Sequence, residues 1–195
     1  MYRTKYIKIP KKRIAILIGK NGSTKKYIEN KSNAELEIDS KEGTVEIIAK
    51  DKEGSAISLW KAKDVVKAIA RGFAPKKAFR LFDEDIYMEI IDLERFLNTR
   101  KQIHRIKGRI IGKSGKSRKI IEEMTDAYIS VYGDTVSIIG EYLSFKIAKS
   151  AVKKLIQGYS HSSVYHFLQK NYNKIQRQKY SLWKTPPEVR DDLEF

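Results

Sequence analysis

The residues best suited to chemistry lie in two short glycine loops with lysines beside them. The loops are residues 19–22 (Gly-Lys-Asn-Gly) and residues 112–115 (Gly-Lys-Ser-Gly), each between an apolar run and a basic stretch with helical spacing. Two glycines three positions apart allow a sharp turn and a close approach of the backbone to a bulky group. The unpaired N–H groups of the following helix point into such a turn. The sequence therefore predicts a phosphate or phosphodiester site at each loop.

The charge of the chain supports a polyanionic ligand. Its 195 residues include 40 lysines and arginines against 24 aspartates and glutamates, a net charge of +16. Such an excess is typical of proteins that bind nucleic acid, and less often of proteins that bind an acidic membrane surface. The lack of cysteine excludes disulfides, thiol catalysis and thiolate metal sites. The three histidines have no metal-ligand spacing, so neither a metal nor another cofactor is expected.

The chain shows no signal for a membrane or for secretion. No apolar run approaches the roughly 20 residues that a membrane-spanning helix needs. Residues 1–5 (Met-Tyr-Arg-Thr-Lys) lead directly into a strand-like segment, without the apolar core of a signal peptide. We therefore expect a soluble, cytoplasmic protein.

The surroundings of the two loops are also duplicated. Each loop lies in the same predicted order: strand, short helix, glycine loop, helix, two strands of a hairpin and a long helix. The second loop follows the first by 93 residues, and this separation holds without a gap to residues 127–131, the counterparts of residues 34–38. Two periods indicate a duplicated domain and not a solenoid. The prediction is an α+β fold of two tandem domains, each a three-stranded sheet packed on helices.

The segments outside the repeats are less regular. Residues 75–77 (Pro-Lys-Lys) are predicted as a hinge. The domains are placed at residues 1–76 and 77–170, followed by a C-terminal extension at residues 171–195 that changes from basic to acidic. From residue 182 onward this tail is expected to be irregular and to dock or to serve as a peptide ligand, with its tryptophan as a partner contact.

The duplicated pattern resembles the KH fold of the eukaryotic type (type I), with the element order βααββα. The blocks that carry the resemblance are Ile-Leu-Ile-Gly-Lys-Asn-Gly at residues 16–22 and Ile-Ile-Gly-Lys-Ser-Gly at residues 110–115. Two further segments restrict this resemblance to one family of KH proteins: residues 78–87 and the His-Ser-Ser-Val-Tyr block at residues 161–165. They are similar to the archaeal form of a family of small-subunit ribosome assembly factors with two KH domains, the partner-of-Nob family. The resemblance covers nearly the whole chain.

The resemblance implies a binding protein and not an enzyme. Proteins of this family bind RNA near the 3′ end of small-subunit ribosomal RNA and assist its maturation. The alpha subunit of translation initiation factor two and the Nob endonuclease are the implied protein partners. In the eukaryotic relatives the first domain often lacks its glycine loop, whereas Gly19 and Gly22 are present here. The sequence therefore leaves open whether one or both domains bind RNA.

The resemblance also implies the residues that contact RNA. A KH domain holds about four nucleotides of a single strand, with the glycine loop on the backbone and the bases on an apolar floor. The predicted backbone contacts are the loops and the basic residues beside them, namely Gly19, Lys20, Asn21, Gly22, Lys25, Lys26, Gly112, Lys113, Ser114, Gly115, Lys116, Arg118 and Lys119. The predicted floor consists of apolar residues in the flanking elements, namely Ile18, Ile28, Leu36, Ile38, Ile111, Ile120, Ile129 and Val131. The same residues also fit a hydrophobic core, and a register shift of one residue would turn the other face of a strand to the bases.

Two other functions fit the same sequence. One is a protein-interaction scaffold, in which the KH surfaces and the tail bind a translation or processing factor. The other is a general regulator that binds single-stranded DNA or messenger RNA, because contacts to the 2′-hydroxyl cannot be identified from sequence. An NTPase is rejected, since residues 108–114 have three residues between their glycines where a nucleotide-binding loop needs four. No pair of nucleophile and base stands out, so no reaction is expected.

Overall fold

The predicted order of elements occurs twice in the structure. The computed structural model describes residues 4–50 and 56–184, with the backbone alone for residue 56 and residues 178–184. The first domain contains β1 (Thr4–Lys8), α1 (Lys11–Ile18), η1 (Lys20–Gly22), α2 (Ser23–Ser32), β2 (Ala34–Asp39), β3 (Thr44–Ala49) and α3 (Ala56–Ala70). The second contains β4 (Ile86–Asp92), η3 (Leu93–Arg95), α5 (Arg100–Ile111), η4 (Lys113–Gly115), α6 (Lys116–Thr125), β5 (Tyr128–Tyr132), β6 (Thr135–Glu141) and α7 (Tyr142–Ile156). Two short elements join the domains, α4 (Pro75–Ala78) and η2 (Phe79–Phe82), and the last helix is α8 (His161–Lys184).

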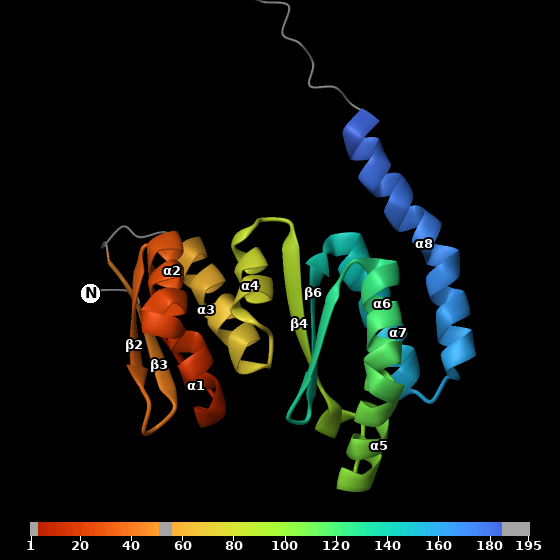
Figure 1. Ribbon diagram of the computed structural model, residues 1–195, viewed down its shortest axis with the longest axis horizontal. Helices are drawn as coiled ribbons and strands as arrows, with labels where there is room; N and C mark the ends of the chain where they lie inside the picture. Colours follow the sequence, from red (N-terminus) through yellow and green to blue (C-terminus); the bar gives the residue numbers. More distant parts are fainter. Residues whose placement is uncertain (1–3, 51–55, 185–195) are drawn as a thin grey trace, which may run out of the picture.

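The two sheets have the same topology and stand in alternating layers with the helices. Both sheets are antiparallel, with strand orders β1-β3-β2 and β4-β6-β5. Figure 1 shows the first sheet, the helices α1 to α4, the second sheet, the helices α5 to α7 and finally α8 following one another across the molecule. The predicted α+β fold with two three-stranded sheets packed on helices is confirmed.

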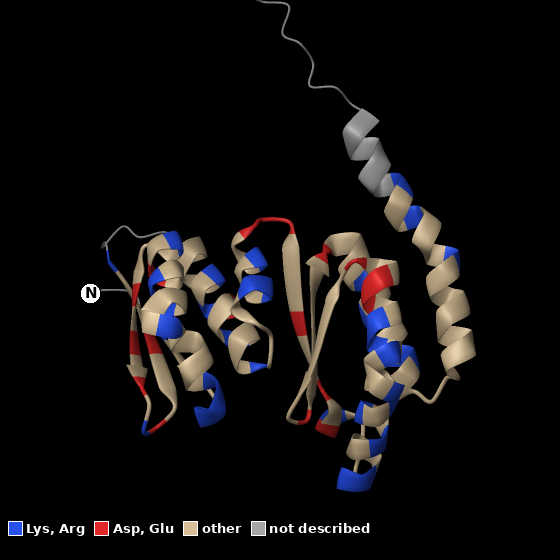
Figure 2. Cartoon of the chain, viewed as in Figure 1, with Lys and Arg blue, Asp and Glu red and all other residues tan. Residues whose placement is uncertain are grey.

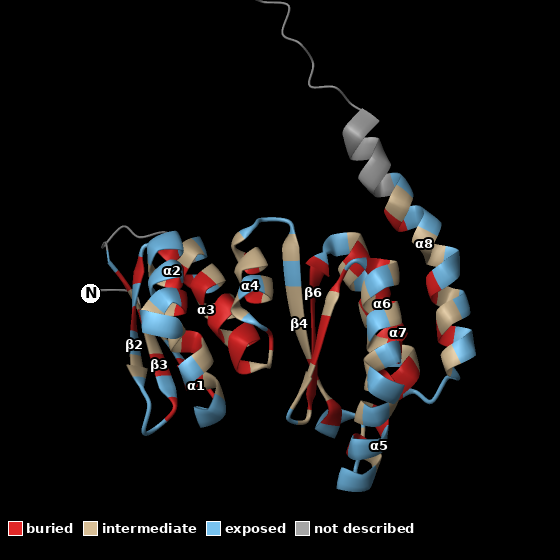
Figure 3. Ribbon diagram, in the orientation of Figure 1, coloured by how far each residue is buried: buried red, intermediate tan, exposed pale blue. Residues whose placement is uncertain are grey.

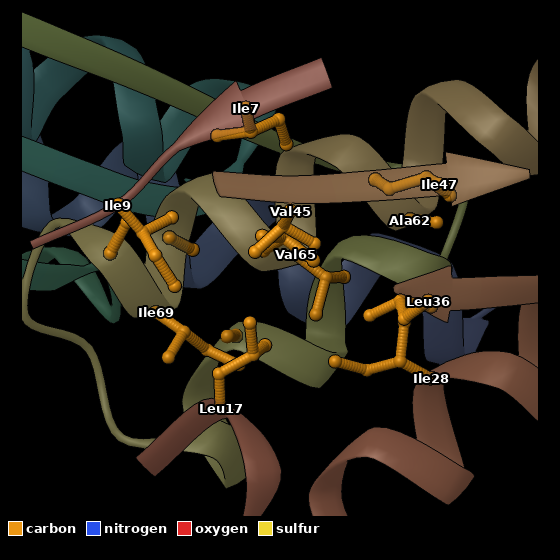
Figure 4. Packing of buried hydrophobic residues seen from close by; sticks show 14 of the residues in the cluster. Ile7, Ile9, Leu17, Ile28, Leu36, Val45, Ile47, Ala62, Val65 and Ile69 are labelled. Carbon is orange, nitrogen blue, oxygen red and sulfur yellow. The ribbon is translucent and has the colours of Figure 1, made fainter. Parts of the chain in front are cut away.

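The core of the first domain arises from alternation in its strands. In β3, Val45 and Ile47 are fully buried while Glu46 and Ile48 face outward, so that one face of the sheet packs on helices. Leu36 of β2 and Ile28 of α2 join them without any exposed surface. Figure 4 shows these side chains meeting residues of α1 and α3 in one packed layer. This packing holds the glycine loop between two anchored helices.

The first core continues into the second domain. Ala78 of α4, Leu81 of η2 and Ile139 of β6 belong to the same cluster of buried residues as the first core. Pro75 opens α4 at its first turn, a position that a proline favours because its missing N–H has no partner there anyway. The prediction of a hinge at residues 75–77 is therefore wrong, because the connection is helical and packs between the domains.

The central strands of the two sheets differ in burial because of this packing. Residues of β3 alternate between exposed and buried, whereas every residue of β6 except Glu141 is buried, as Figure 3 shows. One face of the second sheet packs on α5 to α7, and the other face lies toward α3, α4 and η2 (Figure 1). Among the described residues, helices cover only one face of the first sheet.

The last helix closes the far side of the second domain. Helix α8 packs on α6 and α7 through Val164, Leu168 and Ile175, which recur on one helical face and are buried. It continues to Lys184, so the prediction of an irregular segment from residue 182 fails for its first residues. Residues 185–195 lie outside the described part of the chain. None of the described helices is long and apolar enough to cross a membrane.

Candidate nucleic-acid interface

The two glycine loops have the same backbone conformation. Gly19 and Gly112 have φ angles of +75° and +73°, and Gly22 and Gly115 have φ angles of +76° and +79°. Between them Asn21 and Ser114 both adopt a left-handed conformation with φ +52°. A left-handed serine is uncommon, and such strained positions gather at functional sites. The repeat in the sequence is thus a repeat of a specific turn.

Each loop requires a glycine at its first position because a side chain has no room there. A Cβ atom at Gly19 would lie 2.4 Å from Oγ1 of Thr24, and one at Gly112 would lie 2.6 Å from Cβ of Ser117. The loop therefore folds directly onto the first turn of the following helix. A Cβ atom at the last glycine would meet no close neighbour, with Lys26 Cε 3.9 Å away at Gly22 and nothing within 4 Å at Gly115, so its requirement comes from the positive φ alone.

Each loop leaves the N-terminus of a ten-residue helix open. Gly22 is the N-cap of α2 and Gly115 is the N-cap of α6, and neither helix has a side-chain cap or an acidic residue in its first turn. The first N–H groups of a helix have no partner within it, and the helix dipole adds positive potential at this end. The arrangement is suited to an anion such as a phosphate of a nucleic-acid backbone.

The predicted basic residues divide into free and paired ones. The following predicted polar contacts are exposed beside the loops: Lys20, Asn21, Lys26, Lys113, Ser114, Lys116 and Lys119. Lys25 and Arg118 are instead paired with carboxylates, at 3.8 Å from Glu29 and 3.7 Å from Glu122. Figure 2 shows lysines and arginines along α1, α2, α5 and α6, the helices that flank the loops. We retain the prediction of phosphate contacts for the exposed residues.

A duplicated carboxylate that the sequence analysis missed ties each helix to its strand. The backbone N–H of Leu36 donates to Glu29 Oε1 at 2.9 Å, and the N–H of Ile129 donates to Glu122 Oε1 at 2.8 Å. Glu29 and Glu122 have the same 93-residue separation as the loops, which is the signal that could have found them. Glu29 and Glu122 also form the ion pairs with Lys25 and Arg118, so these two cations neutralise carboxylates beside the site.

Several predicted floor residues belong to the core. Ile28 and Leu36 have no exposed surface, and Ile129 is 3% exposed, so none of them can contact a base in this conformation. Their apolar character was correctly taken from the sequence, but burial in the core explains it. The floor prediction is corrected at these three positions.

A fourth floor residue lies on the wrong side of its helix. Ile120 is two residues from both Arg118 and Glu122, and each residue advances an α-helix by about 100°, so it points away from the side that meets β5. Its counterpart in the first domain, Tyr27, stacks on Phe79 of η2 with ring centroids 4.1 Å apart. The floor prediction is therefore also corrected at Ile120.

Two equivalent pairs of floor residues remain. Ile18 and Ile38 in the first domain, and Ile111 and Val131 in the second, are partly exposed beside the loops. Each pair combines the last residue of the helix before the loop with an inward-facing residue of the edge strand. These four residues stay predicted contacts for bases.

The joining segment contributes charge to the second site. Nζ of Lys77 lies 4.4 Å from the ring centroid of Tyr128 and 3.9 Å from Glu122, and Arg80 also lies over the same ring. Cations from α4 and η2 therefore lie beside the edge strand β5 of the second site. The sequence shows the lysines of α4, which were assigned to a hinge.

Among the described residues, no group of three histidine, aspartate or glutamate side chains could hold a metal ion.

Comparison with known proteins agrees with this geometry. Residues 4–66 match the model of the KH domain, and residues 87–173 match that of the eukaryotic type KH-domain (KH-domain type I). A KH domain-containing protein of Methanocaldococcus jannaschii is 46% identical over 187 residues, which are 96% of this chain and 82% of that protein. The crystal structure of Dim2p from Pyrococcus horikoshii is 48% identical with a TM-score of 0.79, covering 86% of this chain and 99% of that one. The chain belongs to the Dim2p family of two-KH-domain proteins.

Two further structures resemble this Dim2p homologue. A chain in the complex of a/eIF2alpha, aDim2p and rRNA from Pyrococcus horikoshii is 46% identical with a TM-score of 0.82, covering 89% of this chain and 96% of that one. A protein of unknown function from Aeropyrum pernix is 37% identical with a TM-score of 0.85, covering 94% and 98%. The predicted family and its two KH domains are confirmed, and the chain is a KH RNA-binding protein.

Proposed function

We propose that this Dim2p homologue binds single-stranded RNA near the 3′ end of small-subunit ribosomal RNA and assists the maturation of that end. The observation that carries the proposal is the pair of loops with equal backbone angles, each at an open helix N-terminus with exposed lysines. The complex of a homologue with rRNA supports this class of RNA. The role is that of a cytoplasmic binding and assembly factor without a catalytic step.

An unpaired strand fits the site better than a duplex. The loop and the helix N-terminus offer contacts to phosphates, and the neighbouring floor of Ile18 and Ile38, or Ile111 and Val131, is apolar and partly exposed. Bases can lie on such a floor only when they are not paired within a helix. Each domain would hold about four nucleotides in this way.

The packing between the domains supports binding by both loops to one RNA. Ile139 and Leu81 are buried in the shared core, so the two loops keep a fixed separation. Two weak sites at a fixed separation bind a strand that reaches both of them far more tightly than either site alone. The alpha subunit of translation initiation factor two, which is present with a homologue in a crystal, and the Nob endonuclease are the proposed protein partners.

Crosslinking in cells tests the proposal. RNA crosslinked to the full chain is sequenced and compared with RNA crosslinked to a variant that carries aspartate at the exposed loop positions Lys20, Asn21, Lys113 and Ser114. We expect reads concentrated near the 3′ end of small-subunit ribosomal RNA, and their loss in the variant. Reads scattered over messenger RNA would support the alternative of a general regulator and would contradict the assembly role.

Competition between oligonucleotides tests the choice of RNA over DNA. The full chain is titrated with a labelled RNA of the ribosomal 3′ sequence and then with unlabelled RNA or DNA of the same sequence. A KH site that reads the 2′-hydroxyl releases the label at lower RNA than DNA concentrations. Equal competition by RNA and DNA would contradict a preference for RNA and would support the alternative of a protein that binds single-stranded DNA.

A further inference from the structure

The outer face of the first sheet is open and acidic in a strongly basic chain. The strand register places Tyr6, Glu46 and Glu37 side by side in the central row of this face. The rows on either side add Glu35 and Asp39, and the complete face consists of Thr4, Tyr6, Lys8, Thr44, Glu46, Ile48, Glu35, Glu37 and Asp39. Four carboxylates thus stand against one lysine, where the whole chain has a net charge of +16.

The centre of this acidic face is hollowed and carries an exposed aromatic ring. A shallow cavity of about 370 Å³ is lined by Tyr6, Glu37, Ile38, Asp39, Thr44 and Glu46. The ring of Tyr6 is 68% exposed, and its hydroxyl donates to Glu46 Oε1 at 2.7 Å. This hydrogen bond is the main cause that raises the pKa of Tyr6, with smaller contributions from desolvation and from the charges of Glu46 and Glu37. The face therefore combines negative potential with contact area.

The same face of the second sheet is an interface within this molecule. Tyr128, Ser130 and Tyr132 take the places of Glu35, Glu37 and Asp39, and they contact α1, the turn after α3 and the joining elements α4 and η2. The hydroxyl of Ser130 donates to the carbonyl of Arg71 at 2.8 Å.

The elements that pack on this face of the second sheet place positively charged side chains over its tyrosines. The guanidinium of Arg13 lies 5.7 Å from the ring centroid of Tyr132, and Lys77 and Arg80 lie over Tyr128. The outer face of a KH sheet in this chain thus accepts a helical surface that carries lysine and arginine side chains.

We propose that the acidic outer face of the first sheet binds a lysine- and arginine-bearing surface of a protein partner. Opposite charge attracts such a surface, while the phosphates of RNA are repelled from four carboxylates. A second copy of the chain cannot supply the cover seen in the second domain, because η2, Lys77 of α4 and the turn after α3 already contact their own second sheet. The proposal does not depend on the RNA sites and places protein and RNA on different surfaces of the first domain.

A defined probe tests this surface. A helical peptide with lysines and arginines along one side and alanines elsewhere is titrated into the isotope-labelled full chain, and amide shifts are followed by NMR. We expect the largest shifts in β2 and β3 at the residues of the acidic face. Shifts centred on another surface, such as the acidic turn at residues 83–85, would overturn the proposal.

Charge-matched variants make the test specific. Glu35 and Glu37 are exposed, so Glu35→Lys with Glu37→Lys should leave the fold intact, as checked by circular dichroism, and should weaken peptide binding by about tenfold or more. The control is Glu94→Lys with Glu123→Lys, two exposed sites away from the face with the same change in net charge. We expect the control to bind the peptide like the original chain. Equal losses in both variants would show general charge attraction only and would overturn the proposal.

The affinity for RNA separates this proposal from the proposed function. In the variant with Glu35→Lys and Glu37→Lys we expect RNA binding to be unchanged or slightly stronger, because negative charge is removed. A loss of RNA affinity together with the loss of peptide binding would place both ligands on one surface, contrary to the proposal.

Discussion

The central strands of the two KH domains carry different residues at equivalent places. In the first domain Glu46 is partly exposed and accepts a hydrogen bond from Tyr6, whereas its counterpart Ser137 in the second domain is fully buried. Ile48 faces outward in the first sheet, and its counterpart Ile139 is buried in the core shared by the two domains. The glycine loops show no such difference, since their φ angles agree closely.

The difference teaches that the two sides of the KH domain differ between the copies to unequal degrees. The side with the loop has the same backbone geometry in both copies, as the proposed RNA contact at both loops requires. The opposite face of the sheet changes from carboxylates to tyrosine and serine where it must pack on another domain. The chemistry of this opposite face therefore tells which sheet is covered and which is open.

The largest effect is expected where the shared core crosses the domain boundary. Ile139→Ala removes a fully buried side chain and should lower the free energy of unfolding by about 2–5 kcal/mol. The matched change Ile48→Ala lies on the open face and should cost about 1 kcal/mol or less. Chemical denaturation measures both values. Equal losses would contradict the difference between the two sheet faces.

A glycine pair tests the close approach of the domains. Gly72 and Gly158 both end a long helix with φ angles of +98° and +94°. A Cβ atom at Gly72 would lie 2.6 Å from Oγ of Ser130 and 2.8 Å from Cβ of Tyr132, whereas one at Gly158 has no neighbour within 4 Å. Gly158→Ala should cost about 1 kcal/mol for the positive φ alone, and Gly72→Ala about 2–3 kcal/mol, in thermal or chemical unfolding. A smaller cost at Gly72 would mean that the domains separate easily.

A smaller effect of opposite sign is expected at Ser137. Its hydroxyl is buried without a hydrogen-bond partner, so Ser137→Ala removes an unsatisfied polar group and should stabilise the chain by about 1 kcal/mol. Glu46→Ala, at the equivalent open position, should change stability by less than about 0.5 kcal/mol. A destabilised Ser137→Ala variant would show that this hydroxyl has a structural partner after all.

The smallest effect concerns a single titration on the open face. The carboxylate of Glu46 accepts a hydrogen bond from the neutral phenol of Tyr6, which favours the protonated form and raises the pKa of Tyr6. Tyr6 should therefore ionise at a higher pH than an ordinary tyrosine, and Glu46→Gln should shift its pKa downward. NMR titration of the ring signals measures both. An unchanged pKa in the variant would contradict the hydrogen bond.

The sequence was sufficient for the fold and for the loops because their signals can be found without knowledge of any tertiary contact. Glycine spacing and strand alternation depend on near neighbours in the chain, and the constant separation of 93 residues appears when the sequence is compared with itself. All three survive in the structure. The resemblance to the partner-of-Nob family depended on the same blocks. It is confirmed by the similarity to Dim2p.

The remaining site details depended on contacts between distant parts of the chain. Apolar character alone cannot separate a core residue such as Leu36 from a floor residue such as Ile38, two positions further on the same strand face, because only packing decides which of them reaches the surface. Pro75 fits the first turn of a helix as well as a linker. The helical state of this segment follows from the burial of Ala78 and Leu81 in one cluster with Ile139, which is far away in sequence.

The most direct test of the account is the RNA affinity of loop variants in the full chain. Lys113→Asp with Ser114→Asp, and Lys20→Asp with Asn21→Asp, place negative charge where phosphates are expected, on exposed side chains that the fold does not need. The control is Lys170→Asp with Asn173→Asp on the exposed side of α8, which changes the net charge by the same amount. Each loop variant should weaken binding of a ribosomal 3′ RNA by about tenfold or more and the control by about twofold, as measured by fluorescence anisotropy. Loop variants that bind no more weakly than the control would contradict the claim that both glycine loops hold the RNA backbone.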